Sequence, residues 1–178
     1  MYQQVLDFWF EETKPSQWWT KSDSFDQQII DRFTQIHQQA ASCELFQWRE
    51  TSLGRLAEII VLDQFSRNMH RDSVLAFAQD PLALALAQEA VSIGADKTLS
   101  PLERSFLYMP YMHSESLQIH DVATELFDST GIKANIDSEV RHKKIIANFG
   151  RYPHRNQILG RESTPEELEF LTQPGSSF

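Results

Sequence analysis

The sequence predicts an all-α fold, and two observations support this. Nearly every periodic segment of the 178-residue chain has apolar side chains at helical spacing, and none shows the strict alternation of a half-buried strand. Prolines and glycines stand where such helices would begin and end. We therefore expect one compact domain over residues 1–178, with about seven to eight helices packed as antiparallel pairs and a frayed tail at 173–178.

Boundary residues place the individual helices. Asp80, Ser100 and Thr164 are N-cap residues that each precede a proline at the first helical position. Gly94 and Gly150 can adopt the left-handed backbone that ends a helix. Combined with the apolar stripes, these signals predict helices over residues 2–10, 23–42, 52–66, 81–93, 101–109, 115–128, 138–149 and 165–172.

The helix predicted over 52–66 is apolar on more than one face, which indicates a central position. It also carries Arg55, Glu58 and Asp63, whose charges need partners inside a core. Residues 81–114 read as helix, turn, helix over the length of a tetratricopeptide unit, although the aromatic and glycine positions of that repeat are not filled in register.

Composition restricts the class of protein. Cys43 is the single cysteine, so a disulfide framework is excluded and a reducing, cytoplasmic compartment is expected. The N-terminus has no signal-peptide pattern, and no apolar stretch approaches the roughly 18 residues of a membrane span. A net charge of −9 disfavours nucleic acid as a partner. We expect neither a cofactor nor a metal, and the oligomeric state is not indicated.

The most informative pattern is a motif that occurs twice, Phe-x-Arg-x-x-His-Arg. Its residues are Phe65, Arg67, His70 and Arg71 in the first copy, and Phe149, Arg151, His154 and Arg155 in the second. Each copy follows an apolar helical run, so we expect both in loops just past a helix end. Residues 140–161 contain six Lys and Arg and no acid, so this stretch is locally cationic.

Two interpretations of the doubled motif are open. The arginines could converge as a clamp for a carboxylate or phosphate, with the histidines as donors or proton carriers. Alternatively, they could bond the carbonyl groups at the ends of their preceding helices and pair with resident acids. The acids considered for this pairing are Asp63, Asp72, Glu115 and Glu162.

A second candidate site is His113-Ser114-Glu115. Pro110 should end or kink the helix that begins at Pro101, which would place these three residues at a break. A histidine and a carboxylate two residues apart could act as a base and its orienting group, or supply two metal ligands. Alternatively, His113 or Ser114 caps a helix that begins near Glu115.

Motifs along the whole chain resemble the bacterial domain-of-unknown-function family 924. They are Val5-Leu-Asp-Phe-Trp-Phe10, Gly54-Arg-Leu-Ala, Leu62-Asp-Gln-Phe-Ser-Arg-Asn68, Phe106-Leu-Tyr-Met-Pro-Tyr-Met-His-Ser-Glu115, Phe149-Gly-Arg-Tyr-Pro-His-Arg-Asn156 and Gly160-Arg-Glu-Ser-Thr164. The resemblance implies an all-helical, tetratricopeptide-like fold and no established activity. Ser66 stands where the family usually carries proline, which implies a less rigid turn there.

Three functions follow as expectations. The first is binding of a small anionic molecule or an acidic peptide terminus in a cleft. The ligand-binding residues would be Arg67, Asn68, His70, Arg71, Arg151, Arg155 and Asn156. The second is a hydrolase or lyase in which His113 or His154 is the general acid/base, with Glu115 as the carboxylate. The third is a tetratricopeptide-like interaction scaffold. Neither nucleic acid nor a membrane is an expected partner.

Overall fold

A computed structural model describes residues 1–177, and every regular element in that range is helical. The α-helices are α1 (Gln3–Leu6), α2 (Asp23–Ala41), α3 (Ser52–Ile60), α4 (Ser66–Met69), α5 (Asp80–Ser92), α6 (Pro101–Met112), α7 (Leu117–Asp128), α8 (Lys133–Phe149) and α9 (Pro165–Leu171). The π-helical segments are η1 (Asp7–Glu12) and η4 (Val61–Phe65). The 3-10 helices are η2 (Pro15–Trp19), η3 (Phe46–Glu50), η5 (Val74–Phe77), η6 (Ala95–Thr98) and η7 (Pro153–Arg155). The predicted all-α class is confirmed.

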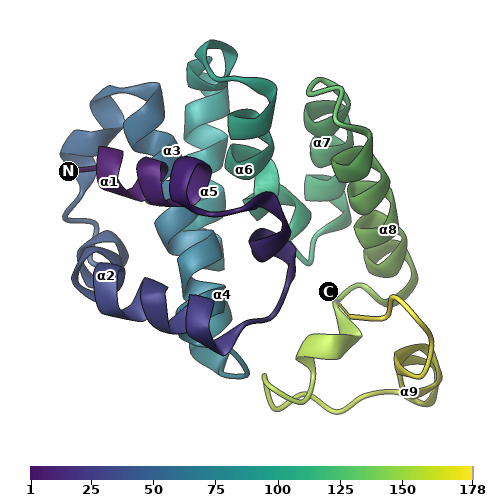
Figure 1. Ribbon diagram of the computed structural model, residues 1–178. Helices are drawn as coiled ribbons and strands as arrows, with labels where there is room; N and C mark the ends of the chain where they lie inside the picture. The colour runs from purple at the N-terminus through teal and green to yellow at the C-terminus, as the bar shows by residue number, and fades with distance from the viewer. Residues whose placement is uncertain (178) are drawn as a thin grey trace.

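The helices pack around α3 and its continuation η4. This central run contacts α1, α2, α5 and α6, and α6 in turn contacts the α7–α8 hairpin. In Figure 1 the hairpin stands on the right of the molecule, and the segment with η7 and α9 lies below it. Helix α6 therefore joins the N-terminal helices to the C-terminal part of the chain.

The main core is aromatic and surrounds the central run. Phe65 is fully buried, and its ring centroid lies 4.9 Å from that of Phe33 and 5.6 Å from that of Trp9. Every residue from Leu56 to Phe65 is buried, which confirms the central position predicted for this helix. Its charged residues find partners, since Glu58 binds Arg49 at 2.7 Å through both oxygens. Arg55 pairs with Glu89.

A second, smaller apolar cluster joins α8 to the C-terminal segment. It consists of Ile145, Ile146 and Tyr152, with Phe149 and Phe170 packed against it. The ring centroids of Phe149 and Phe170 are 5.0 Å apart. The C-terminal segment therefore has little apolar contact of its own and depends on polar contacts for its position.

The predicted caps are confirmed at Ser100, Thr164 and Gly150, whereas Asp80 is the first residue of α5 rather than its N-cap, and its carboxylate accepts from Arg67. The Ser100 hydroxyl accepts from the Glu103 N–H, and the Glu103 carboxylate accepts from the Ser100 N–H at 2.7 Å. Thr164 and Glu167 form the same reciprocal cap on α9. Gly150 ends α8 with a φ of 68°, a backbone region that favours glycine.

Three helix boundaries differ from the prediction. Helix α6 continues to Met112 although Pro110 lacks an N–H, because every residue from Ser105 to Met112 is buried and packing outweighs the lost bond. Helix α8 begins at Lys133, five residues before the predicted 138, since its first turns are too polar to show an apolar stripe. Helix α7 begins at Leu117, so neither His113 nor Ser114 is its N-cap.

The stretch Val74–Ser92, which includes α5, is long and apolar enough by length and composition to cross a membrane. The expectation that no apolar stretch reaches this length is therefore wrong by that measure. The buried side chains of α5 are Ala83, Ala87 and Ala90, which pack into the main core. The cytoplasmic location stays a prediction.

Candidate functional site

The two copies of the Phe-x-Arg-x-x-His-Arg motif have different local structures. In the second copy Phe149 ends α8, and the remaining residues lie in the following loop and η7, as predicted. In the first copy, Phe65 and Arg67 lie inside a continuous run of η4 and α4, so the expectation of a loop is wrong for them. Ser66 is helical as well, and its hydroxyl donates to the Leu62 carbonyl at 2.5 Å.

The outer part of the first copy binds a resident acid. The Arg71 guanidinium donates to both carboxylate oxygens of Asp26, at 2.6 and 2.7 Å, and Asn68 donates to the same carboxylate at 2.8 Å. His70 lies beside His37, with ring centroids 5.4 Å apart. Because Asp26 is buried on α2, these contacts fasten the end of α4 to α2.

The outer part of the second copy binds a different acid. Arg151 donates to both carboxylate oxygens of Glu167, at 2.6 and 2.7 Å, and to the Glu162 carbonyl at 2.8 Å. Asn156 donates to Glu167 at 3.1 Å. The side chain of Glu167 is 3% exposed, so these bonds hold α9 against the loop after α8. The four arginines therefore do not form a single clamp.

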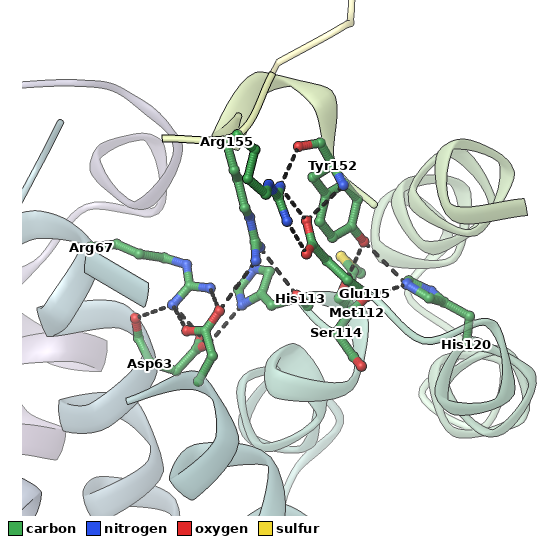
Figure 2. A network of polar contacts seen from close by, with 11 residues as sticks. Asp63, Arg67, Met112, His113, Ser114, Glu115, His120, Tyr152 and Arg155 are labelled. Carbon is green, nitrogen blue, oxygen red and sulfur yellow. Dashed lines mark hydrogen bonds and ion pairs between the residues drawn. The ribbon is translucent and has the colours of Figure 1, made fainter. Parts of the chain in front are cut away.

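The inner arginines of the two copies do meet, because both contact Asp80. Figure 2 shows Arg67 and Arg155 within this polar network, beside Asp63 and His113. Arg67 donates to both oxygens of Asp80, at 2.9 and 3.0 Å, and also lies 3.1 Å from Asp63. Arg155 reaches Asp80 at 3.4 Å and donates to the His113 carbonyl at 3.1 Å. We call Asp63, Arg67, Asp80, His113 and Arg155 the inner cluster.

Within the inner cluster, His113 is bonded to Asp63. Its Nδ1 lies 2.7 Å from Asp63 Oδ1, and the two side chains are 13% and 1% exposed. Burial would raise the pKa of Asp63, but Arg67 and His113 lower it, so this carboxyl is ionised at neutral pH. Burial and Arg67 lower the pKa of His113, so its imidazole is neutral. Nδ1 therefore donates to Asp63, and Nε2 carries the lone pair.

Glu115 does not orient His113, contrary to the prediction. Its oxygens accept from Arg161 at 2.6 and 2.9 Å and from the Tyr152 backbone N–H at 2.8 Å. Burial would raise the pKa of Glu115, but these bonds lower it. Arg161 also donates to Asn156 at 3.0 Å. Glu115 thus fixes the loop after α8 to the α6–α7 connection.

A second histidine–carboxylate pair is closed to solvent. His120 Nδ1 lies 2.7 Å from Glu139 Oε1, its Nε2 lies 2.9 Å from the Ser114 carbonyl, and both side chains are at most 1% exposed. The Tyr152 hydroxyl donates to the Met112 carbonyl at 2.5 Å and lies 3.1 Å from His120 Nε2. This pair therefore braces α7 against α8, whereas the His113 pair retains some exposure.

The charges of the inner cluster balance, because two carboxylates face two guanidiniums and the imidazole is neutral. Of the two guanidiniums, that of Arg155 nevertheless makes fewer hydrogen bonds. Burial and Arg67 lower its pKa, although Asp80 and Glu115 oppose this shift. Its Nε is buried and has no hydrogen-bond partner within residues 1–177.

His154 lies beside the inner cluster and lines a cavity. This cavity has a volume of about 670 Å³ and is bounded by Leu168 and Leu171 of α9 and by six residues of the preceding loop: Pro153, His154, Gln157, Arg161, Glu162 and Ser163. Burial and Arg155 lower the pKa of His154 to about 4, so its imidazole is neutral. Of the predicted site residues, His154 is the one that lines this cavity.

Metal ligation is not supported by the geometry. Within residues 1–177, no three His, Cys, Asp or Glu side chains come together in a group that could hold a metal ion. Glu115 is bonded to Arg161, so the pair of metal ligands considered for His113 and Glu115 is not formed.

Sequence reasoning missed the acids that organise the site. The sequence predicts Asp80 as a helix cap and indicates no arginine partner for Glu167 or Asp26. Each also accepts an arginine of the doubled motif. Their distance along the chain from those arginines leaves no local pattern, so only the tertiary structure reveals the pairs.

The fold and this network define an all-helical domain in which a charge-balanced polar cluster joins the central helices to the C-terminal segment. The chain belongs to the family described as bacterial protein of unknown function (DUF924), whose model matches residues 5–175. It is similar to the structure of the protein of unknown function ATU0120 from Agrobacterium tumefaciens, with 38% identity, a TM-score of 0.91 and 96% of each chain covered. Comparison with curated proteins gives no match.

Proposed function

We propose that the protein binds a small molecule bearing a carboxylate or phosphate group, and that Arg155 anchors this group. The supporting observation is a buried guanidinium that has fewer hydrogen-bond acceptors than N–H groups. The Arg155 side chain is 7% exposed, and its Cζ lies 4.6 Å from the ring centroids of both Phe77 and Tyr152. Two of its five N–H groups have hydrogen-bond acceptors among residues 1–177.

Asp80 supplies little to Arg155, because both Asp80 oxygens are already engaged by Arg67 at shorter distances. A buried cation without enough acceptors is costly, so an added anionic acceptor is favourable at this position. The planar guanidinium suits two-point bonding to a carboxylate or phosphate. Arg71 and Arg151 lack this property, since each already binds one carboxylate through two nitrogens.

The test compares anions at matched ionic strength. We expect inorganic phosphate or succinate to raise the melting temperature of the wild-type protein more than sodium chloride does. Arg155→Gln should remove this additional stabilisation. The matched control is Arg71→Gln, which breaks the pair with Asp26 and should lower the melting temperature but keep the additional shift.

Two outcomes would overturn the proposal. In one, neither anion stabilises the wild-type protein beyond the effect of chloride. In the other, Arg155→Gln retains the full shift.

An interaction scaffold would instead need an exposed concave apolar surface. The large apolar side chains that are more than half exposed are spread over several parts of the chain, and only Val74 and Leu75 share an element: Met1, Trp19, Phe46, Val74, Leu75, Ile93, Val140 and Leu168.

A further inference from the structure

The pair formed by Asp63 and His113 has the geometry of a proton-transfer site. Asp63 lies on η4 and His113 at the end of α6, so two well-packed helical elements fix the distance of 2.7 Å between Oδ1 and Nδ1. Gln64 donates to the other oxygen of Asp63 at 2.6 Å, and Arg67 lies 3.1 Å from Oδ1. The carboxylate is therefore held in one orientation and keeps its negative charge toward the imidazole.

The second nitrogen of His113 is available. Nε2 forms no hydrogen bond with any residue in 1–177, and this nitrogen is not fully buried. The side chain retains 13% exposure. An imidazole whose Nδ1–H is bonded to a carboxylate carries its lone pair on Nε2, which is the arrangement that accepts a proton.

The neighbouring Arg155 suggests which substrate such a base would act on. Arg155 donates to the His113 carbonyl at 3.1 Å, so an anion held by its guanidinium would lie beside this histidine. We infer that His113, oriented by Asp63, is the general base of an esterase that hydrolyses small esters carrying a second, anionic group. The preference for an anionic group rests on the function proposed for Arg155, whereas the role of His113 does not.

The reaction balances with water as the co-reactant. Nε2 takes one proton from water while the water oxygen bonds to the ester carbonyl carbon, and Asp63 stabilises the resulting imidazolium. The imidazolium then returns this proton to the alcohol oxygen as the bond between that oxygen and the carbonyl carbon breaks. One water is consumed, and one acid and one alcohol are released.

The test uses two chromogenic esters, 4-nitrophenyl acetate and mono-4-nitrophenyl succinate, of which the second carries a free carboxylate. We expect His113→Asn to lower the rate on both esters by about tenfold or more, since general-base catalysis contributes roughly 10²–10⁴. The wild-type rate should rise with pH through a pKa below 6.5 and then level off. Asp63→Asn should lower the rate and alter this pH profile, which a merely structural role would not do.

The control for a damaged fold is His37→Asn. His37 is buried, is bonded to Ser66 at 2.8 Å and is not a member of the inner cluster, so this variant should lose stability but keep the esterase rate. Equal rates for the wild-type protein and His113→Asn on both esters would overturn the inference. If His113→Asn loses activity but Arg155→Gln keeps the full preference for the succinate ester, the base stands and the anion site at Arg155 fails.

Discussion

Replacing Asp63 by Asn tests whether the inner cluster depends on a buried charge. The substitution keeps the size of the side chain but removes the charge that faces His113 at 2.7 Å and Arg67 at 3.1 Å. Breaking one side of a buried ion pair costs about 3–5 kcal/mol. Arg67 keeps both bonds to Asp80, so we expect a loss at the lower end, about 3 kcal/mol, in the free energy of unfolding.

The assay is urea unfolding at pH 7, followed by circular dichroism. The matched control is Asp121→Asn, because Asp121 also pairs with a cation, Lys143 at 2.8 Å, but its side chain is 66% exposed. An exposed pair contributes at most about 1 kcal/mol. If Asp63→Asn and Asp121→Asn lose the same free energy within error, the reasoning about the buried cluster is wrong.

The same variant predicts a change in pH dependence. The pKa of Asp63 is lowered from its ordinary value of 3.8, so its contribution to stability is present above that pH and is lost as the pH falls below it. Wild-type stability should therefore decrease on acidification from about pH 5 to pH 3, and the decrease should be smaller in Asp63→Asn. An unchanged acid profile would contradict the assigned ionisation.

Three further predictions concern other parts of the fold. Gly54→Ala should lower the free energy of unfolding by about 1–3 kcal/mol, because its Cβ would lie 2.0 Å from the Trp48 carbonyl oxygen; an unchanged urea midpoint would refute this. Glu167→Ala removes the partner of Arg151 and one half of the cap on α9, so amide hydrogen exchange should accelerate in residues 150–171 well before the central helices are affected. The pKa of His154 is lowered to about 4, so protonation of the unfolded chain should reduce stability as the pH falls from 6.5 toward 4, and His154→Gln should flatten this decrease in thermal unfolding.

Much of the fold could be predicted from the sequence because its signals are local. The apolar stripe of the central helix, the caps at Ser100 and Thr164 and the glycine at 150 each act within one or two helical turns. The start of α8 was missed for the same reason, since a polar first turn carries no apolar pattern. Pro110 misled the prediction because its local cost is outweighed by burial, which the sequence does not display.

The candidate site was only partly predictable. Arg67 and Arg155 of the doubled motif meet at Asp80, and His113 lies between α6 and α7, at the predicted break. Their role in binding or catalysis stays a prediction. The carboxylate beside His113 is Asp63, fifty residues away in the chain, rather than Glu115. Partners at this separation are chosen by helix packing, so a sequence pattern shows which groups need a partner but not which group supplies it.

The attachment of the C-terminal segment has a consequence for how the molecule responds to salt. Residues 150–171 are tied to the helical body largely by charged side chains, such as Arg161 on Glu115 and Arg155 on the His113 carbonyl, with one small apolar cluster. Screening ions weaken contacts of this kind, while strongly hydrated salts such as sulfate strengthen the aromatic interior. A single solute can therefore destabilise the attachment of residues 150–171 while it stabilises the aromatic interior. The melting temperature of the whole protein would conceal these opposite effects, whereas a site-resolved measurement such as amide hydrogen exchange would show them.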